Sequence, residues 1–134
     1  MASVAPPPIT YQPVLPQAII EQGRLSLPQL ETITYAGQAH SHMLPSAEGQ
    51  QAFRRGYFVG SGTGMGKGRI VAGIIADNFQ QGRKRAIWIS EKAALVQDAR
   101  RDWQGAVDGD QQQIFELAKM QLRSPIKATE GILF

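Results

Sequence analysis

The chain has 134 residues, 43% of them hydrophobic and none of them cysteine, and a formal net charge of +3. This length suits one domain with a hydrophobic core rather than two domains of ordinary size. The lack of cysteine excludes a disulfide framework and a cysteine-based zinc site. No apolar run approaches the roughly 18 residues of a membrane span, and the N-terminus lacks a signal-peptide pattern, so we expect a cytoplasmic protein without a membrane partner.

Residues 1–16 hold five of the eight prolines. This composition is typical of extended, polyproline-like chain, and we assign residues 1–23 to a Pro-rich arm and residues 24–134 to the folded domain. The next segment, residues 25–40, is expected to be a helix, since Ser26 can cap it and Pro28 fits its first turn. A polar loop should follow.

The middle of the chain alternates strand and helix signals. Residues 55–60 form a short apolar run of high β-propensity, and a helix of apolar periodicity follows the glycines and ends at Gly82. Residues 86–90 predict a second, buried strand, and Ser90 can cap a helix that reaches Trp103. This β-α-β-α order predicts an α/β fold with a parallel sheet and flanking helices.

The C-terminal part is less decisive. Residues 111–120 fit either a helix or a strand, because periodicity cannot decide a run this short. Residues 131–134, "GILF", predict a buried strand. A core strand at the end of the chain suggests a truncated domain, and it would leave an exposed edge that favours self-association.

Positive charge gathers in residues 51–105, which contain ten Lys or Arg and four acidic residues. Such an excess attracts polyanions such as nucleotides or nucleic acid, although a solvated basic face has the same composition.

The glycine-rich stretch "GSGTGMGKGR" lies between the first strand and its helix. The phosphate-loop pattern G-x-x-x-x-G-K-[ST] is matched by Gly66 and Lys67, but its first position is Ser61 and its last is Gly68. In such loops the backbone N–H groups and the helix N-terminus surround phosphate groups while the lysine neutralises their charge. The flanking strand and helix favour phosphate binding over an ordinary flexible turn.

The run "YFVGSGTGMGKGRIVAGIIADNFQQGRKRAIWIS" resembles the N-terminal part of the helicase-like NTPase domain of the strawberry notch family, which is grouped with superfamily 2 helicases. The likeness extends over residues 11–134, and glycine after the loop lysine is characteristic of that family. It implies a partial RecA-like P-loop domain of a nucleic-acid-dependent NTPase that uses ATP and Mg²⁺, with Lys67 as the catalytic lysine. The implied nucleotide-binding residues are Ser61, Gly62, Thr63, Gly64, Met65, Gly66, Lys67, Gly68 and Arg69.

The resemblance also implies roles outside the loop. Gln29 stands where such helicases place a glutamine that reads the adenine edge, although Ser26 and Gln29 also match a capping box. Ser90 and Lys92 stand where related proteins contact the backbone of DNA or RNA. The same resemblance favours a strand for "QQIFEL".

Three other patterns give little support for a metal-binding or catalytic site. His40 and His42 lack the neighbours of a metal site, so we expect none there. Asp98 and Asp102 lie one helical turn apart beside Arg101, a pattern more typical of a charged surface than of a catalytic pair. Gly68 has no hydroxyl for magnesium, so the ion would be held through water and phosphates.

Superfamily 2 NTPases also need a Walker B acidic motif and an arginine finger, and neither is recognisable in this sequence. We therefore expect the chain to bind nucleotide without hydrolysing it alone. Two alternatives stay open: a non-catalytic interaction module, and a small self-contained nucleotide-binding protein.

Overall fold

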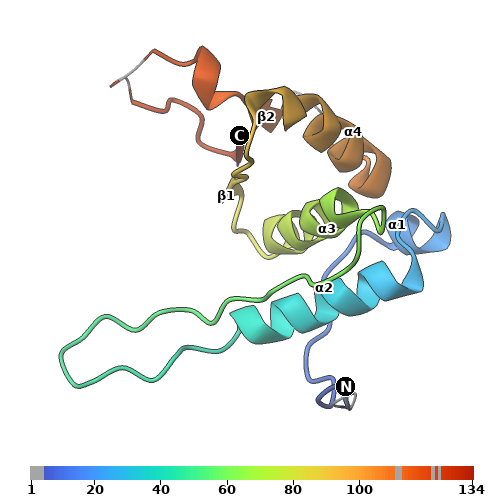
Figure 1. The fold of residues 1–134 in the computed structure, drawn as a ribbon, viewed down its shortest axis with the longest axis vertical. Coiled ribbons are helices and arrows are strands. Elements are labelled where there is room, and N and C mark those ends of the chain that lie inside the picture. The colour runs from blue at the N-terminus through green and yellow to red at the C-terminus, as the bar shows by residue number, and fades with distance from the viewer. Residues whose placement is uncertain (1–4, 111–112, 122, 124) are drawn as a thin grey trace.

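The computed structural model describes residues 5–110, 113–121, 123 and 125–134 (Figure 1). Within them, three parallel strands are ordered β1-β3-β2. The helices pack beside this sheet, so the predicted α/β fold with a parallel sheet and flanking helices is confirmed. The helices are α1 Gln17–Glu21, α2 Leu27–His40, α3 Lys67–Gln80 and α4 Val96–Val107; the strands are β1 Arg85–Ile87, β2 Ile114–Phe115 and β3 Gly131–Leu133; 3₁₀ turns span Ala93–Leu95 and Leu117–Lys119.

Helix α3 is the centre of the helical layer, because it packs against both α2 and α4. A Cβ at Gly73 would lie 3.2 Å from Ile33 Cγ1, so glycine lets α2 and α3 approach closely. On the other side, the buried Trp103 of α4 meets Phe79 of α3 edge-on, with ring centroids 5.6 Å apart. The position of α3, and of the loop before it, is therefore fixed from two sides.

The predicted boundaries of α2 and α3 agree with the structure. Ser26 is the N-cap of α2 and Pro28 lies in its first turn. Helix α3 ends just before Gly82, whose φ of 82° is a left-handed conformation that glycine adopts without strain. Residues 41–54 form the expected loop, closed by an isolated antiparallel bridge between Met43 and Arg54.

The predicted strand at residues 55–60 is wrong. None of these residues belongs to a strand, and the Phe58 side chain is 88% exposed. The backbone N–H of Arg55 donates instead to His42 O at 2.9 Å, across the loop between α2 and α3. High β-propensity produced no strand here because no strand of the described sheet lies alongside to accept its hydrogen bonds.

The second predicted strand is shorter and more exposed than expected. Among the described residues strand β1 pairs with β3 alone, and Ile87 and Ile89 are 71% and 88% exposed, so a strand buried over residues 86–90 is a wrong prediction. Ser90 does not cap the helix that follows. The extended backbone of Lys92 (φ −131°, ψ 134°) separates Ser90 from the 3₁₀ turn at Ala93–Leu95, and α4 begins at Val96.

The C-terminal strand is central rather than peripheral. Ile132 of β3 pairs with Ala86 of β1 on one side and with Ile114 of β2 on the other. Ile132 is fully buried, so β3 is a core strand as predicted, but its expected exposed edge is wrong. The strand expected within "QQIFEL", residues 112–117, is confirmed at Ile114–Phe115, while residue 112 of that run lies outside the described residues.

The N-terminal segment is attached to the domain. Residues 5–16 are without regular structure, but residues 17–21, within the predicted extended arm, form α1, and Ile19 is buried; residues 1–4 lie outside the described part. The anchor is Asp77 of α3, a carboxylate 2% exposed, which accepts from Tyr11 Oη at 2.6 Å and from the N–H of Val14 at 2.7 Å. A buried carboxylate with these donors ties the segment to α3.

We expect Tyr11→Phe to lower the free energy of unfolding by about 1.5 kcal/mol, because it removes a hydrogen bond to a buried carboxylate. Burial, and then the hydrogen bond to Asp77, raise the pKa of Tyr11 above its usual value. The folded chain therefore holds this proton more tightly than the unfolded chain, and stability should fall as pH rises above about 10.

Urea unfolding of Tyr11→Phe between pH 8 and pH 11 tests both effects. Tyr35→Phe is the matched control, since its hydroxyl donates to the neutral carbonyl of Pro7. The same alkaline loss of stability in Tyr11→Phe as in the unmodified chain would contradict the assignment.

Candidate nucleotide site

The glycine-rich loop before α3 is held in a tight turn. Gly64 and Gly66 have φ of 84° and 71°, and Gly66 is the N-cap of α3. Residues with a side chain rarely adopt such positive φ angles, so the backbone conformation explains why positions 64 and 66 are glycine. When residues of left-handed and right-handed backbone conformation alternate, their successive N–H groups point toward one side. This arrangement, called a nest, binds anions.

The loop presents a row of free hydrogen-bond donors. The N–H groups of residues 62–66 donate to no acceptor among the described residues. Lys67 and Gly68 open α3, where helix geometry leaves their N–H groups without an intrahelical acceptor. The positive end of the helix dipole lies at the same place. The loop therefore has the donors and the polarity that a phosphate group requires.

Lys67 lies over its own loop. Its Nζ donates to Gly62 O at 2.9 Å and to Ser61 O at 3.1 Å. An ammonium group has three donors, so one N–H remains for another acceptor. The lysine thus places a positive charge beside the free N–H groups. Ser61 and Gly62 contribute through their carbonyl groups.

Gln29 touches the loop from α2. Its Oε1 accepts from the Ser26 N–H at 3.0 Å, as in a capping box, and its Nε2 donates to Met65 O at 3.2 Å. A Cβ at Gly66 would lie 2.5 Å from Gln29 Nε2. The side chain therefore joins the N-terminus of α2 to the loop, a contact that the sequence did not predict.

Asp102 reaches the loop from α4. A Cβ at Gly68 would lie 2.8 Å from Asp102 Cγ and would overlap Oδ2. The sequence placed Asp102 on a charged surface, whereas its side chain is 21% exposed and faces the start of α3. One signal in the sequence indicated partial burial of Asp102, because it adjoins Trp103 on the buried side of an amphipathic helix. Its contact with Gly68 could not be predicted, since it depends on how α3 and α4 pack.

Not all predicted site residues lie at the loop. Arg69 turns away from it, since its Nη1 donates to Arg24 O at 3.2 Å. Ser90 and Lys92 follow β1 and are exposed, and among the described residues neither side chain has a hydrogen-bond or ion-pair partner. Thr63 and Met65 are exposed on the loop itself.

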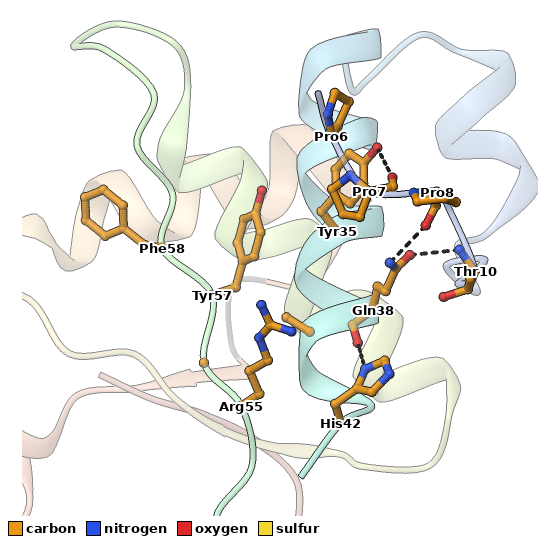
Figure 2. A pocket seen from close by; sticks show the side chains of 12 residues that line it. Pro6, Pro7, Pro8, Thr10, Tyr35, Gln38, His42, Arg55, Tyr57 and Phe58 are labelled. Atoms are coloured by element: carbon orange, nitrogen blue, oxygen red, sulfur yellow. Dashed lines mark hydrogen bonds between the residues drawn. The ribbon is translucent and has the colours of Figure 1, made fainter. Parts of the chain in front are cut away.

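A separate cavity of about 710 Å³ lies at the other end of α2 (Figure 2). Tyr57 and Arg55 face α2 across it, and Gln38 holds the proline segment there, donating to Pro8 O at 3.1 Å. Gln29 and Gln38 are nine residues apart, which is about 13 Å along a helix. The cavity is therefore distinct from the glycine loop.

Two features are absent from the described residues. Within that part of the chain, no three or more His, Asp or Glu side chains gather as a metal-ion cage would require. In the same part, no helix combines the length and apolar character needed to cross a membrane.

Comparison with known proteins decides the family. A family model described as P-loop containing NTP hydrolase pore-1 matches residues 1–134. The chain belongs to this family. Its relatives include Protein strawberry notch of Drosophila melanogaster, 48% identical over 76% of the chain, and Protein strawberry notch homolog 2 of Homo sapiens, 41% identical over 100%. Protein FORGETTER 1 of Arabidopsis thaliana is 43% identical over 76%.

The strawberry notch resemblance is thus confirmed. The matched regions amount to 6%, 9% and 8% of these three relatives, so the chain spans less than a tenth of their length. No solved structure matches the chain.

Proposed function

We propose that the chain binds ATP through residues 61–68, as the nucleotide-binding part of a helicase-like, nucleic-acid-dependent NTPase of the cytoplasm. The supporting observation is the row of free N–H groups at residues 62–66, directly before a lysine and the N-terminus of α3. Helix N-termini and nests of this kind bind phosphate.

Each part of the loop has a proposed task. The N–H groups of residues 62–68 would donate to phosphate oxygens, and Lys67 would neutralise their charge from the carbonyl groups of Ser61 and Gly62. Arg69 would act from outside the loop, adding positive charge at the start of α3. Mg²⁺, when bound with the nucleotide, neutralises phosphate charge and orients the β- and γ-phosphates.

For nucleic acid we propose contact at Ser90 and Lys92. Both side chains are exposed, and Lys92 precedes the 3₁₀ turn at Ala93–Leu95. A hydroxyl and an ammonium group are typical phosphate-backbone contacts. Such contacts position a strand without reading its sequence, so this region does not distinguish DNA from RNA.

The role of Gln29 separates two proposals. If its amide reads adenine, Gln29→Ala should weaken ATP binding about fivefold to a hundredfold more than GTP binding, because a base edge loses its partner. If Gln29 only braces Met65 and caps α2, both nucleotides should lose affinity equally. Isothermal titration with ATP and GTP measures the difference, and Gln38→Ala, on the same helix but beside the cavity, is the control.

Two other functions predict different results with nucleotide, and one observation tests each. An interaction module would bind neither ATP nor GTP at the loop. A self-contained nucleotide enzyme would hydrolyse ATP without further chain. The free N–H groups beside Lys67 favour nucleotide binding over the first of these.

A further inference from the structure

In the phosphate-loop pattern, the residue after the lysine carries a hydroxyl that binds magnesium. Here that residue is Gly68, which has no side chain. The space that a side chain at this position would take holds the carboxylate of Asp102 instead, with Cγ 2.8 Å from the position of a Cβ. A carboxylate oxygen from α4 therefore lies where the Ser or Thr hydroxyl of the phosphate-loop pattern would be.

The Asp102 carboxylate makes no close hydrogen bond or ion pair with any described residue. Among the described residues its single polar contact is with Arg101, whose Nε lies 4.0 Å from Oδ1. Arg101 makes a closer pair with Asp98, at 2.9 Å between Nη1 and Oδ1. Oδ2, the atom that faces Gly68, accepts no hydrogen bond from any described residue.

We propose that Asp102 is the magnesium-binding carboxylate of the nucleotide site and replaces the hydroxyl that Gly68 lacks. The proposal rests on the proposed function, nucleotide binding at residues 61–68. Magnesium is commonly bound through one or two carboxylates together with substrate phosphates and water, so a single aspartate beside the phosphate loop suffices. Gly68 has the role of leaving room for it.

A structural role makes a different prediction. A carboxylate near the N-terminus of α3 also stabilises the helix through its dipole. Loss of that interaction would lower the free energy of unfolding without any dependence on magnesium. The decisive quantity is therefore the ratio of ATP affinities measured with Mg²⁺ and with EDTA, rather than affinity or stability alone.

The experiment is isothermal titration of ATP into the full chain, with Mg²⁺ and with EDTA. In the unmodified chain Mg²⁺ should raise the affinity about tenfold. In Asp102→Asn, which keeps the side-chain shape, this gain should disappear while affinity in EDTA is unchanged or improved. Asp98→Asn, on the same helix but paired with Arg101, is the control and should keep the gain.

Two more measurements sharpen the test. Gly68→Ser with Asp102→Ala places the usual hydroxyl in the space that the carboxylate leaves, and the gain from Mg²⁺ should return. Electron paramagnetic resonance of Mn²⁺ with ATP should show a signal from immobilised Mn²⁺ that is lost in Asp102→Asn.

The outcomes distinguish the two proposals. An unchanged gain from Mg²⁺ in Asp102→Asn would overturn the magnesium assignment and leave nucleotide binding standing. No ATP binding by the unmodified chain, with or without Mg²⁺, would overturn both.

Discussion

The isolated chain should show no ATP hydrolysis above background. In phosphoryl transfer nearly all catalysis comes from positioning and charge stabilisation, and an arginine finger alone contributes about 10³ to 10⁵ in rate. The sequence provides the loop and Lys67 but no Asp-Glu motif after a strand. Asp102, as a proposed magnesium ligand, supplies neither the water-positioning group nor the arginine finger. Binding should therefore occur without appreciable turnover.

Phosphate release measures this, with and without single-stranded and double-stranded DNA and RNA. The Lys67→Ala chain shows whether any signal comes from a contaminating ATPase, since a contaminant is unaffected by the substitution. Turnover that nucleic acid stimulates and Lys67→Ala abolishes would contradict the prediction and favour a self-contained enzyme.

Lys67→Ala should weaken ATP binding about tenfold to a hundredfold, the effect of removing a charge-assisted hydrogen bond. The N–H groups of residues 62–66 would then bind the phosphates without a cation beside them. Adenosine has no phosphate, so its affinity should hardly change. Titration of both ligands separates loss of phosphate binding from general damage to the fold.

Lys84→Ala is the matched control, because Lys84 is an exposed lysine that pairs with Glu130 at 3.5 Å. It should bind ATP as the unmodified chain does. A Lys67→Ala chain with the ATP affinity of this control would remove Lys67 from the site.

Elements with strong local signals were predictable from the sequence. Ser26 and Pro28 determine the start of α2, and Gly82 marks the end of α3, because caps and left-handed turns depend on neighbouring residues alone. The glycine-rich turn before α3 was predictable for the same reason, since its glycines and Lys67 lie within one short stretch.

Features that depend on pairing between distant segments were not predictable. Residues 55–60 have β-propensity but no neighbouring strand in the described part of the chain, and β3 lies between β1 and β2, an order that no single segment encodes. Propensity describes which backbone conformation suits a segment, whereas a strand also needs a neighbouring strand whose N–H and C=O groups pair with its own. The contacts of Gln29 with Met65 and of Asp102 with Gly68 likewise arise from helix packing.

The central claim is that phosphates bind at the backbone of residues 62–68, and amide NMR during an ATP titration tests it most directly. The ¹H–¹⁵N signals of these residues should shift saturably with ATP and little with adenosine, because the N–H groups would donate to phosphate oxygens. Shifts confined to the cavity beside Gln38 and Tyr57, with the loop signals unchanged, would contradict the account.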